Sequence, residues 1–207
     1  MTALIELHGA RTGNCFRVAI ALEESGLPYE RYRVDLRQGA HRSSEFLALN
    51  PHGKVPVLID RRVHGDLVLT QSNAIMLHLA ASAPDQLAPV DGDDQRARLY
   101  ERLLYFVTDV IAPSHAGFLL RSTNEEAGAV TLQRRSIVNL EASERYLEDG
   151  SFMLGDRFSL VDIAAVTIAS ASEDQLDWPK VPALRAWYER VMARPAVNRG
   201  FQAFTTD

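Results

Sequence analysis

The chain has 207 residues, of which 46% are hydrophobic, and a formal net charge of -5 at pH 7. A chain of this length and composition can bury a core in one or two domains, which excludes wholesale disorder. The weak negative charge, without a long basic run, argues against nucleic acid and an anionic membrane surface as partners.

The first part of the chain, residues 1–82, predicts an α/β domain with the element order β-α-β-α-β-β-α. A turn at 11–14 can cap the first helix, and Gly26 is suited to end it. The expected elements are strands at 4–7 and 29–36, helices at 16–22, 43–49 and 72–81, and a hairpin of strands at 57–59 and 67–70.

The remainder predicts only helices. Residues 82–94 are polar and contain proline, so we expect a linker there. Residues 96–111 and 132–147 carry apolar side chains at three- and four-residue spacing. Ser159 and Asp162 have the spacing of a helix capping box, and 181–192 is expected to be the last helix, before Pro195.

Two segments of the first domain indicate a binding site. Val55-Pro56 lies between a glycine-containing turn and an apolar strand, where proline is expected at a strand start or edge. A cis bond there would expose the main-chain N–H and C=O of Val55. Gln71 and Ser72 stand at the start of the following helix. A strand edge beside a helix N-terminus suits a short peptide with a carboxylate.

Several other kinds of site are not expected. With 1 Cys, Cys15, neither an intrachain disulfide nor a Cys-based zinc site is possible, and a reducing cytoplasm fits. The six histidines lack metal-ligand spacing, so no metal is expected. Residues 1–7 lack the features of a signal peptide, and no apolar stretch approaches the ~20 residues that span a bilayer.

These segments, in this order and spacing, resemble the cytosolic glutathione transferases over the full length of the chain. The matching pieces are the N-terminal turn and helix, Asn50–Leu58, Gln71–Ile75 and Ser159–Ile163. The resemblance implies a thioredoxin-like domain over 1–82, an all-helical domain over 90–207, and a cytoplasmic homodimer. It also implies glutathione as co-substrate, a small-molecule electrophile or disulfide as second reactant, and a role in detoxification.

The resemblance assigns residues to parts of glutathione. The Val-Pro bond of the family is cis, and the residue before it, here Val55, pairs with the cysteinyl part. Gln71 and Ser72 match the pair that binds the γ-glutamyl end, where most members have Glu in place of Gln71; an ordinary helix cap is the alternative for Ser72. Lys54 and His41 are candidates for the glycyl end, with exposed loop residues as the alternative.

The residue that meets the glutathione sulfur differs between classes of the family, and the turn at 10–18 contains no tyrosine. Thr12 falls where some classes keep a serine, and Asn14 where another keeps a cysteine, so Cys15 lies one position late. This Thr-x-Asn pattern looks most like the bacterial nu class. That class is associated with reduction of small disulfides and peroxides and can hold two glutathiones or the oxidised dimer.

The physical requirement is stabilisation of a thiolate. An unperturbed thiol has a pKa of roughly 8.5, and lowering it by ~2 units requires ~2.7 kcal/mol of preference for the anion. The Thr12 hydroxyl, the Asn14 amide and helix N–H groups can supply this, although neither side chain is a general base. A plain helix cap is the alternative. Cys15, beside Phe16 and Val18, is expected to face inward and be inert.

The second reactant is less well defined by the sequence. Tyr105, Asp109 and Pro113 have suitable spacing for an acceptor site, with core or dimer contacts as the alternative. Arg134 and Arg135 could meet the carboxylate of a second glutathione, or lie in solvent.

Two functions remain open: an enzyme that activates glutathione, or a non-catalytic interaction module of the same fold. The intact Val55-Pro56 and Gln71-Ser72 pairs favour the enzyme.

Overall fold

The computed structural model describes residues 4–63 and 65–205, which form two compact units. Unit 1 consists of residues 1–87 and 194–207, and unit 2 of residues 88–193. The chain therefore divides close to the expected linker, but its C-terminal residues belong to unit 1. We describe each unit by itself.

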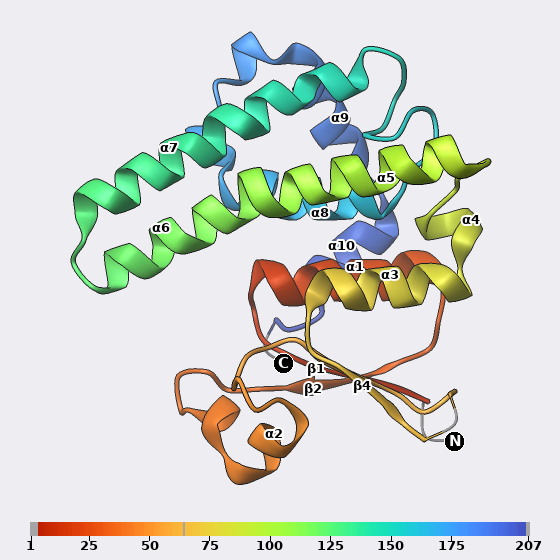
Figure 1. The fold of residues 1–207 in the computed structure, drawn as a ribbon, viewed down its shortest axis with the longest axis vertical. Helices are drawn as coiled ribbons and strands as arrows, with labels where there is room; N and C mark the ends of the chain where they lie inside the picture. The colour runs from red at the N-terminus through yellow and green to blue at the C-terminus, as the bar shows by residue number, and fades with distance from the viewer. Residues whose placement is uncertain (1–3, 64, 206–207) are drawn as a thin grey trace. The chain divides into compact units, whose positions relative to one another are not determined.

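Unit 1 contains a sheet with the strand order β2-β1-β3-β4. Strand β1 pairs parallel with β2 and antiparallel with β3, which pairs antiparallel with β4. The elements in chain order are β1 (Ile5–Gly9), α1 (Gly13–Ser25), β2 (Glu30–Arg33), η1 (Ala40–Arg42), α2 (Ser44–Leu49), β3 (Val57–Asp60), β4 (Leu67–Leu69), α3 (Ser72–Ser82), α4 (Pro84–Leu87) and α10 (Pro195–Gln202). Figure 1 shows α1 and α3 together on one side of the sheet and α2 on the other. The expected thioredoxin-like order is confirmed.

Local sequence accounts for the first elements of this unit. Ile5 and Leu7 of β1 are fully buried while their neighbours are half-buried, which is the alternation of a strand with one covered face. The Thr12 side chain accepts a hydrogen bond from the Cys15 N–H and so caps α1. At the other end Gly26 adopts a left-handed φ of 67°, as a helix-ending glycine should.

The structure corrects two expectations about this unit. The expected linker contains the short helix α4, and Pro195 begins helix α10 instead of following the last helix. Proline is favoured in the first turn of a helix, because the N–H that it lacks has no partner there. Helix α10 packs closely on α1: a Cβ on Gly200 would lie 2.4 Å from Cγ1 of Ile20. Arg194 also pairs with Glu24 through two bonds of 2.7 Å.

Unit 2 has only helices among the named elements of its described residues, as expected, and one isolated bridge joins Phe152 to Gly155. Its elements are α5 (Asp93–Tyr105), the π-helical turn η2 (Phe106–Ile111), α6 (Ala112–Ser122), α7 (Glu126–Ala142), η3 (Ser143–Leu147), α8 (Leu160–Ala171), η4 (Glu173–Gln175), η5 (Trp178–Lys180) and α9 (Pro182–Met192). The sequence did not indicate α6, which continues the line of α5 and η2 (Figure 1).

The π-helical turn η2 has a local cause. Pro113 has no N–H to donate to the carbonyl of Asp109, four residues earlier. The Asn139 side chain of α7 donates to that carbonyl instead, at 2.9 Å, and Ser136 donates to the carbonyl of Val110 at 2.7 Å. Side chains of α7 therefore satisfy the main chain where the helix is irregular.

The run Asp93–Ser122 also corrects the expectation that no apolar stretch approaches the length of a membrane span. It is 30 residues long and contains an 18-residue window with a mean hydropathy of 1.4. By length and composition alone, this helix could cross a membrane, but one such helix is weak evidence for a membrane-spanning segment.

The capping box expected at residues 159–162 is confirmed. Ser159 caps α8, and the carboxylate of Asp162 accepts from the Ser159 N–H at 2.9 Å. Asp162 is wholly buried and also accepts from the Met153 N–H and the Trp187 indole, both at 2.8 Å. Burial raises the pKa of this carboxyl, and these donors oppose the rise.

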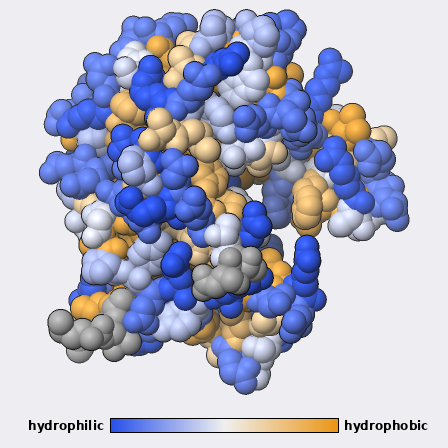
Figure 2. Space-filling model, turned by 180° about the vertical axis from the view of Figure 1, so that it is seen from behind, coloured by the Kyte–Doolittle hydropathy of each residue, from blue (hydrophilic) through white to orange (hydrophobic). Residues whose placement is uncertain are grey.

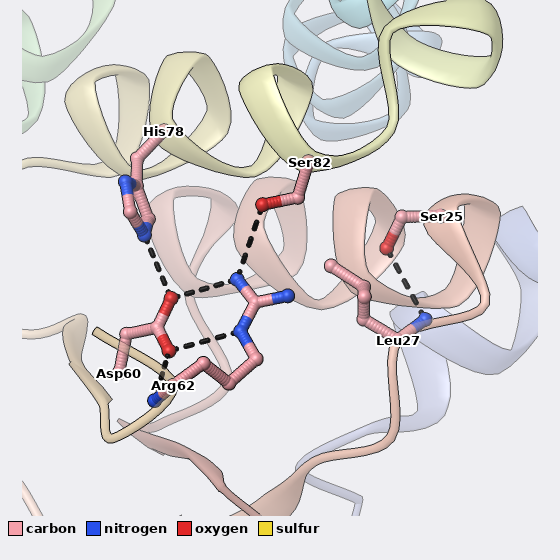
Figure 3. A network of polar contacts seen from close by, with 6 residues as sticks. All are labelled: Ser25, Leu27, Asp60, Arg62, His78 and Ser82. Carbon is pink, nitrogen blue, oxygen red and sulfur yellow. Dashed lines mark hydrogen bonds and ion pairs between the residues drawn. The ribbon is translucent and has the colours of Figure 1, made fainter.

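A second buried carboxylate joins the sheet of unit 1 to α3. Asp60, at the end of β3, is fully buried and accepts from Nε and Nη2 of Arg62 at 2.9 and 2.7 Å. Nε2 of His78 on α3 lies 2.7 Å from Oδ2 of Asp60, the oxygen that also accepts from Nη2 of Arg62. The same Nη2 donates to Ser82 at 3.3 Å (Figure 3). The hydrogen bonds from Arg62 are the main reason that the pKa of the Asp60 carboxyl lies well below its usual range.

We predict that Asp60→Asn lowers the free energy of unfolding by about 2 kcal/mol at neutral pH, because hydrogen bonds to a charged group are lost. A depressed folded-state pKa stabilises the protein above the unfolded-state value of roughly 3.9, and this contribution is lost as the pH falls below it. The difference between variant and wild type in urea unfolding should therefore shrink in acid.

Asp66→Asn is the matched control, since Asp66 pairs with Arg61 on the surface. Its effect should stay within about 0.5 kcal/mol. Equal losses of unfolding free energy in the two variants would contradict the role of Asp60. A difference between Asp60→Asn and wild type that does not depend on pH would contradict it as well.

Candidate functional site

Two of the segments singled out in the sequence meet at one edge of the sheet. His8 of β1 pairs with Val57 of β3, so the turn that follows β1 lies beside the chain that enters β3. That chain contains a cis Val55-Pro56 bond, as expected. The N–H and C=O of Val55 make no hydrogen bond with any residue that the structure describes. An extended peptide can therefore pair with this main chain.

The side chain of Val55 anchors this segment of main chain. It packs against a small core in which Val34, Phe46 and Val57 are buried, beneath η1 and α2. The side chain is thereby held against this core, while the main chain of Val55 makes no hydrogen bond with the described residues. The local fold thus presents a short strand edge rather than a flexible loop.

The N-terminus of α3 contains the Gln71-Ser72 pair that the sequence singled out. Gln71 occupies the cap position, but its side chain makes no capping hydrogen bond and is exposed. Ser72 follows as the first helical residue and is only 6% exposed. The free N–H groups of this first turn, together with the helix dipole, favour a carboxylate.

Arg17 is a site residue that sequence reasoning missed. It lies on α1 and is 3% exposed, and its Nη1 lies 2.5 Å from Oδ1 of Asn14 and 3.4 Å from Oγ of Ser72. Burial lowers the pKa of this guanidinium to about 10, so it stays charged at neutral pH. The signal in the sequence was a single arginine inside the apolar run expected to form the first helix.

Thr12 and Cys15 contact each other. The Thr12 hydroxyl lies 3.1 Å from the Cys15 sulfur, and the Ala10 N–H donates to the same sulfur at 3.3 Å. Cys15 is fully buried, and burial raises the pKa of its thiol, against the opposing effect of the hydrogen bond from Thr12. Thr12 is thus a helix cap here, while Cys15 faces inward.

One histidine and two cationic residues lie near the chain that leads to Val55. His41 lies in η1, and its Nδ1 is buried without a hydrogen-bond partner in the described part of the chain. Gly53 has a φ of 57°, and a Cβ there would lie 2.9 Å from the His41 carbonyl and from Nη1 of Arg42. Only glycine suits this close approach. Lys54 is exposed, and its carbonyl accepts from the Asn50 side chain at 2.6 Å. The sequence did not point to Arg42.

The candidates for an acceptor site lie in unit 2. The Tyr105 hydroxyl donates to the Asn139 carbonyl at 2.6 Å, Asp109 pairs with Arg135 at 3.8 Å, and Pro113 is buried. Arg134 is exposed. Among residues 4–63 and 65–205, no group of three or more His, Cys, Asp or Glu is placed to hold a metal.

Comparison with known families gives two matches. Residues 4–81 match the glutathione S-transferase N-terminal domain, and residues 105–195 match the glutathione S-transferase C-terminal domain. The chain is 31% identical over 193 residues to glutathione S-transferase GstB of Escherichia coli, covering 90% of this chain and 91% of that protein. It is 32% identical to glutathione S-transferase theta-1 of Bos taurus, covering 86% of this chain and 78% of the relative.

Solved structures share the fold. A glutathione transferase of Burkholderia graminis, with two glutathione molecules bound per subunit, is 28% identical with a TM-score of 0.81, covering 96% of this chain and 87% of that one. A glutathione transferase family member from Pseudomonas fluorescens is 24% identical with a TM-score of 0.85, covering 96% and 92%.

Proposed function

Because this chain belongs to the glutathione S-transferase family, we propose that it is an enzyme that binds glutathione in unit 1 and stabilises the ligand thiolate. The observation that carries this proposal is the meeting of Asn14 and Ser72 at one buried guanidinium, on the helices that follow strands β1 and β4 of the same sheet. Separate segments of the chain therefore supply one site.

We assign each part of the tripeptide to a part of this site. The main chain of Val55 pairs with the cysteinyl residue as an added strand. Ser72 and the first turn of α3 bind the γ-glutamyl carboxylate, with Gln71 beside its ammonium group. His41 and Lys54 face the glycyl carboxylate, and the buried Nδ1 of His41 lacks a hydrogen-bond partner among the described residues.

The chemistry follows from the groups at the start of α1. Neither Thr12 nor Asn14 can remove a proton at neutral pH, so the thiol loses its proton to solvent and the site stabilises the anion left behind. Oδ1 of Asn14 already accepts from Arg17, which leaves its Nδ2 to donate to sulfur. Since the Thr12 hydroxyl also contacts Cys15, we expect Asn14 to be the stronger donor.

We propose further that the enzyme acts on disulfides or peroxides, as the nu class does, rather than mainly on carbon electrophiles. The Thr-x-Asn arrangement of Thr12 and Asn14 supports this, as does the relative from Burkholderia graminis that holds two glutathione molecules per subunit. A non-catalytic module is the alternative, and the groups kept at Val55, Ser72 and Asn14 argue against it.

We also propose that the protein is cytoplasmic and forms a homodimer. The homodimer is proposed because unit 2 leaves apolar side chains in solvent. Five large apolar side chains on α5, α6 and α7 are at least half exposed: Leu104 (56%), Phe118 (67%), Leu119 (51%), Val130 (50%) and Val138 (54%). The apolar 18-residue window within Asp93–Ser122 is only 28% buried. Figure 2 shows apolar surface among hydrophilic residues on the α6–α7 arm, at the right of the view. A second copy of the chain would cover it.

We predict that Asn14→Ala raises the pKa of bound glutathione by about one unit, which corresponds to about tenfold less thiolate at neutral pH. The ultraviolet absorbance of the thiolate, titrated against pH, measures this shift. Asn198→Ala, which removes an exposed amide on α10, should leave the titration unchanged. An unchanged titration in the Thr12→Val/Asn14→Ala double variant would refute the role of both residues.

Titration calorimetry at millimolar ligand should show glutathione disulfide binding about tenfold more tightly than glutathione, because the disulfide fills the positions of two tripeptides. Ser72→Ala should weaken both by about tenfold through loss of a bond to a carboxylate. If glutathione binds more tightly than its disulfide, with one molecule per subunit, conjugation would be indicated instead. If neither ligand binds, the non-catalytic interaction module would be favoured.

Sedimentation analysis should give twice the mass of the 23.0 kDa chain for the wild type and a monomer for Phe118→Asp, since a charge in an apolar interface is costly. Leu4→Asp is the control, because Leu4 is 54% exposed but lies on unit 1 before β1. A monomeric wild type would contradict the dimer.

A further inference from the structure

The buried guanidinium of Arg17 faces two parts of the proposed site with the same nitrogen. Nη1 lies 2.5 Å from Oδ1 of Asn14 and 3.4 Å from Oγ of Ser72. Asn14 is assigned to the ligand sulfur and Ser72 to the γ-glutamyl carboxylate. One side chain therefore connects the group that meets the sulfur with the group that holds the other end of the ligand.

The contact also determines which way the Asn14 amide points. A guanidinium carries only N–H donors, so the amide atom that faces it must be the oxygen. The NH₂ group of Asn14 is then turned away from Arg17, and it makes no hydrogen bond with the residues in the described ranges. An amide turned the other way would present its oxygen to a thiolate and repel it.

We propose, on the basis of the function proposed above, that Arg17 is a positioning residue: it fixes the Asn14 amide with its NH₂ toward the ligand sulfur and couples that orientation to Ser72. Its action passes through Asn14 and does not require contact with the ligand. Binding of the γ-glutamyl end at Ser72 and ionisation of the thiol are then linked events within one hydrogen-bonded unit.

Arg17→Lys separates positioning from simple charge. Lysine keeps the positive charge, but its single ammonium group lacks the planar arrangement of donors that holds an amide in one orientation. We expect the pKa of bound glutathione, measured from thiolate absorbance, to rise by about one unit in Arg17→Lys. Adding Asn14→Ala to Arg17→Lys should then change the pKa of bound glutathione little further, whereas Asn14→Ala in the wild type should raise it by about one unit. An unchanged titration in Arg17→Lys, or additive effects of the two substitutions, would overturn the proposal.

Arg194→Met is the matched control, because Arg194 also anchors α1, through Glu24, away from Asn14 and Ser72. It should lower the melting temperature while leaving the thiol titration unchanged. If Arg17→Lys does not fold, a double-mutant cycle of Asn14→Ala and Ser72→Ala tests the coupling instead. Non-additive shifts in the thiol pKa support coupling through Arg17, and additive shifts overturn it.

Failure of this inference is distinguishable from failure of the proposed function. If the wild type does not bind glutathione or its disulfide by calorimetry, the function itself is wrong. If the wild type binds and ionises glutathione while the Arg17 variants titrate like wild type, only the positioning role fails.

Discussion

The burial of one positive charge constrains the proposed ligand-binding face of unit 1. Removing a guanidinium from water is costly unless hydrogen-bond acceptors replace the water. Arg17, at 3% exposure, finds such acceptors in Asn14 on its own helix and Ser72 on α3. Moving either helix start away would leave a charge without these partners. The first turns of α1 and α3 are therefore held together, and the pairing of β1 with β3 brings the start of β3, which follows Val55-Pro56, to the end of β1 that precedes α1.

The rest of unit 1 holds these two helices along their length. Asp60 binds His78 on α3, several residues after the turn that contains Ser72. Helix α1 is fixed near its C-terminal end by α10, through the ion pair of Glu24 with Arg194 and the close contact of Gly200 with Ile20. Rigid support of this kind matters because a thiolate gains little from a donor that can turn away.

Local signals made much of this architecture predictable. The cis Val55-Pro56 step and the capping box at Ser159 depend on residues close together in the sequence. Helix α10 was missed because proline at residue 195 can end one helix or begin another, and only packing against α1 distinguishes these. Arg17 was missed because Ser72 is 55 positions away in the sequence. The contact of Thr12 with Cys15 was equally invisible, since it depends on a rotamer rather than on residue type.

The fold also resolves an apparent conflict between the acidic composition and the proposed anionic ligand. A tripeptide with two carboxylates and a thiolate would be repelled by a uniform field of net charge -5. At physiological salt, however, charges act over roughly 8 Å, so the electrostatic contribution to ligand binding comes mainly from the groups around the site. Those groups are the Arg17 guanidinium, Arg42 and Lys54 near Gly53, and the N–H groups that begin α3. Because the main contributions come from a buried cation and main-chain dipoles rather than surface lysines, binding should depend little on net charge. The same reasoning explains how an acidic chain could bind the proposed small anion, whereas nucleic acid binding requires an extended basic surface.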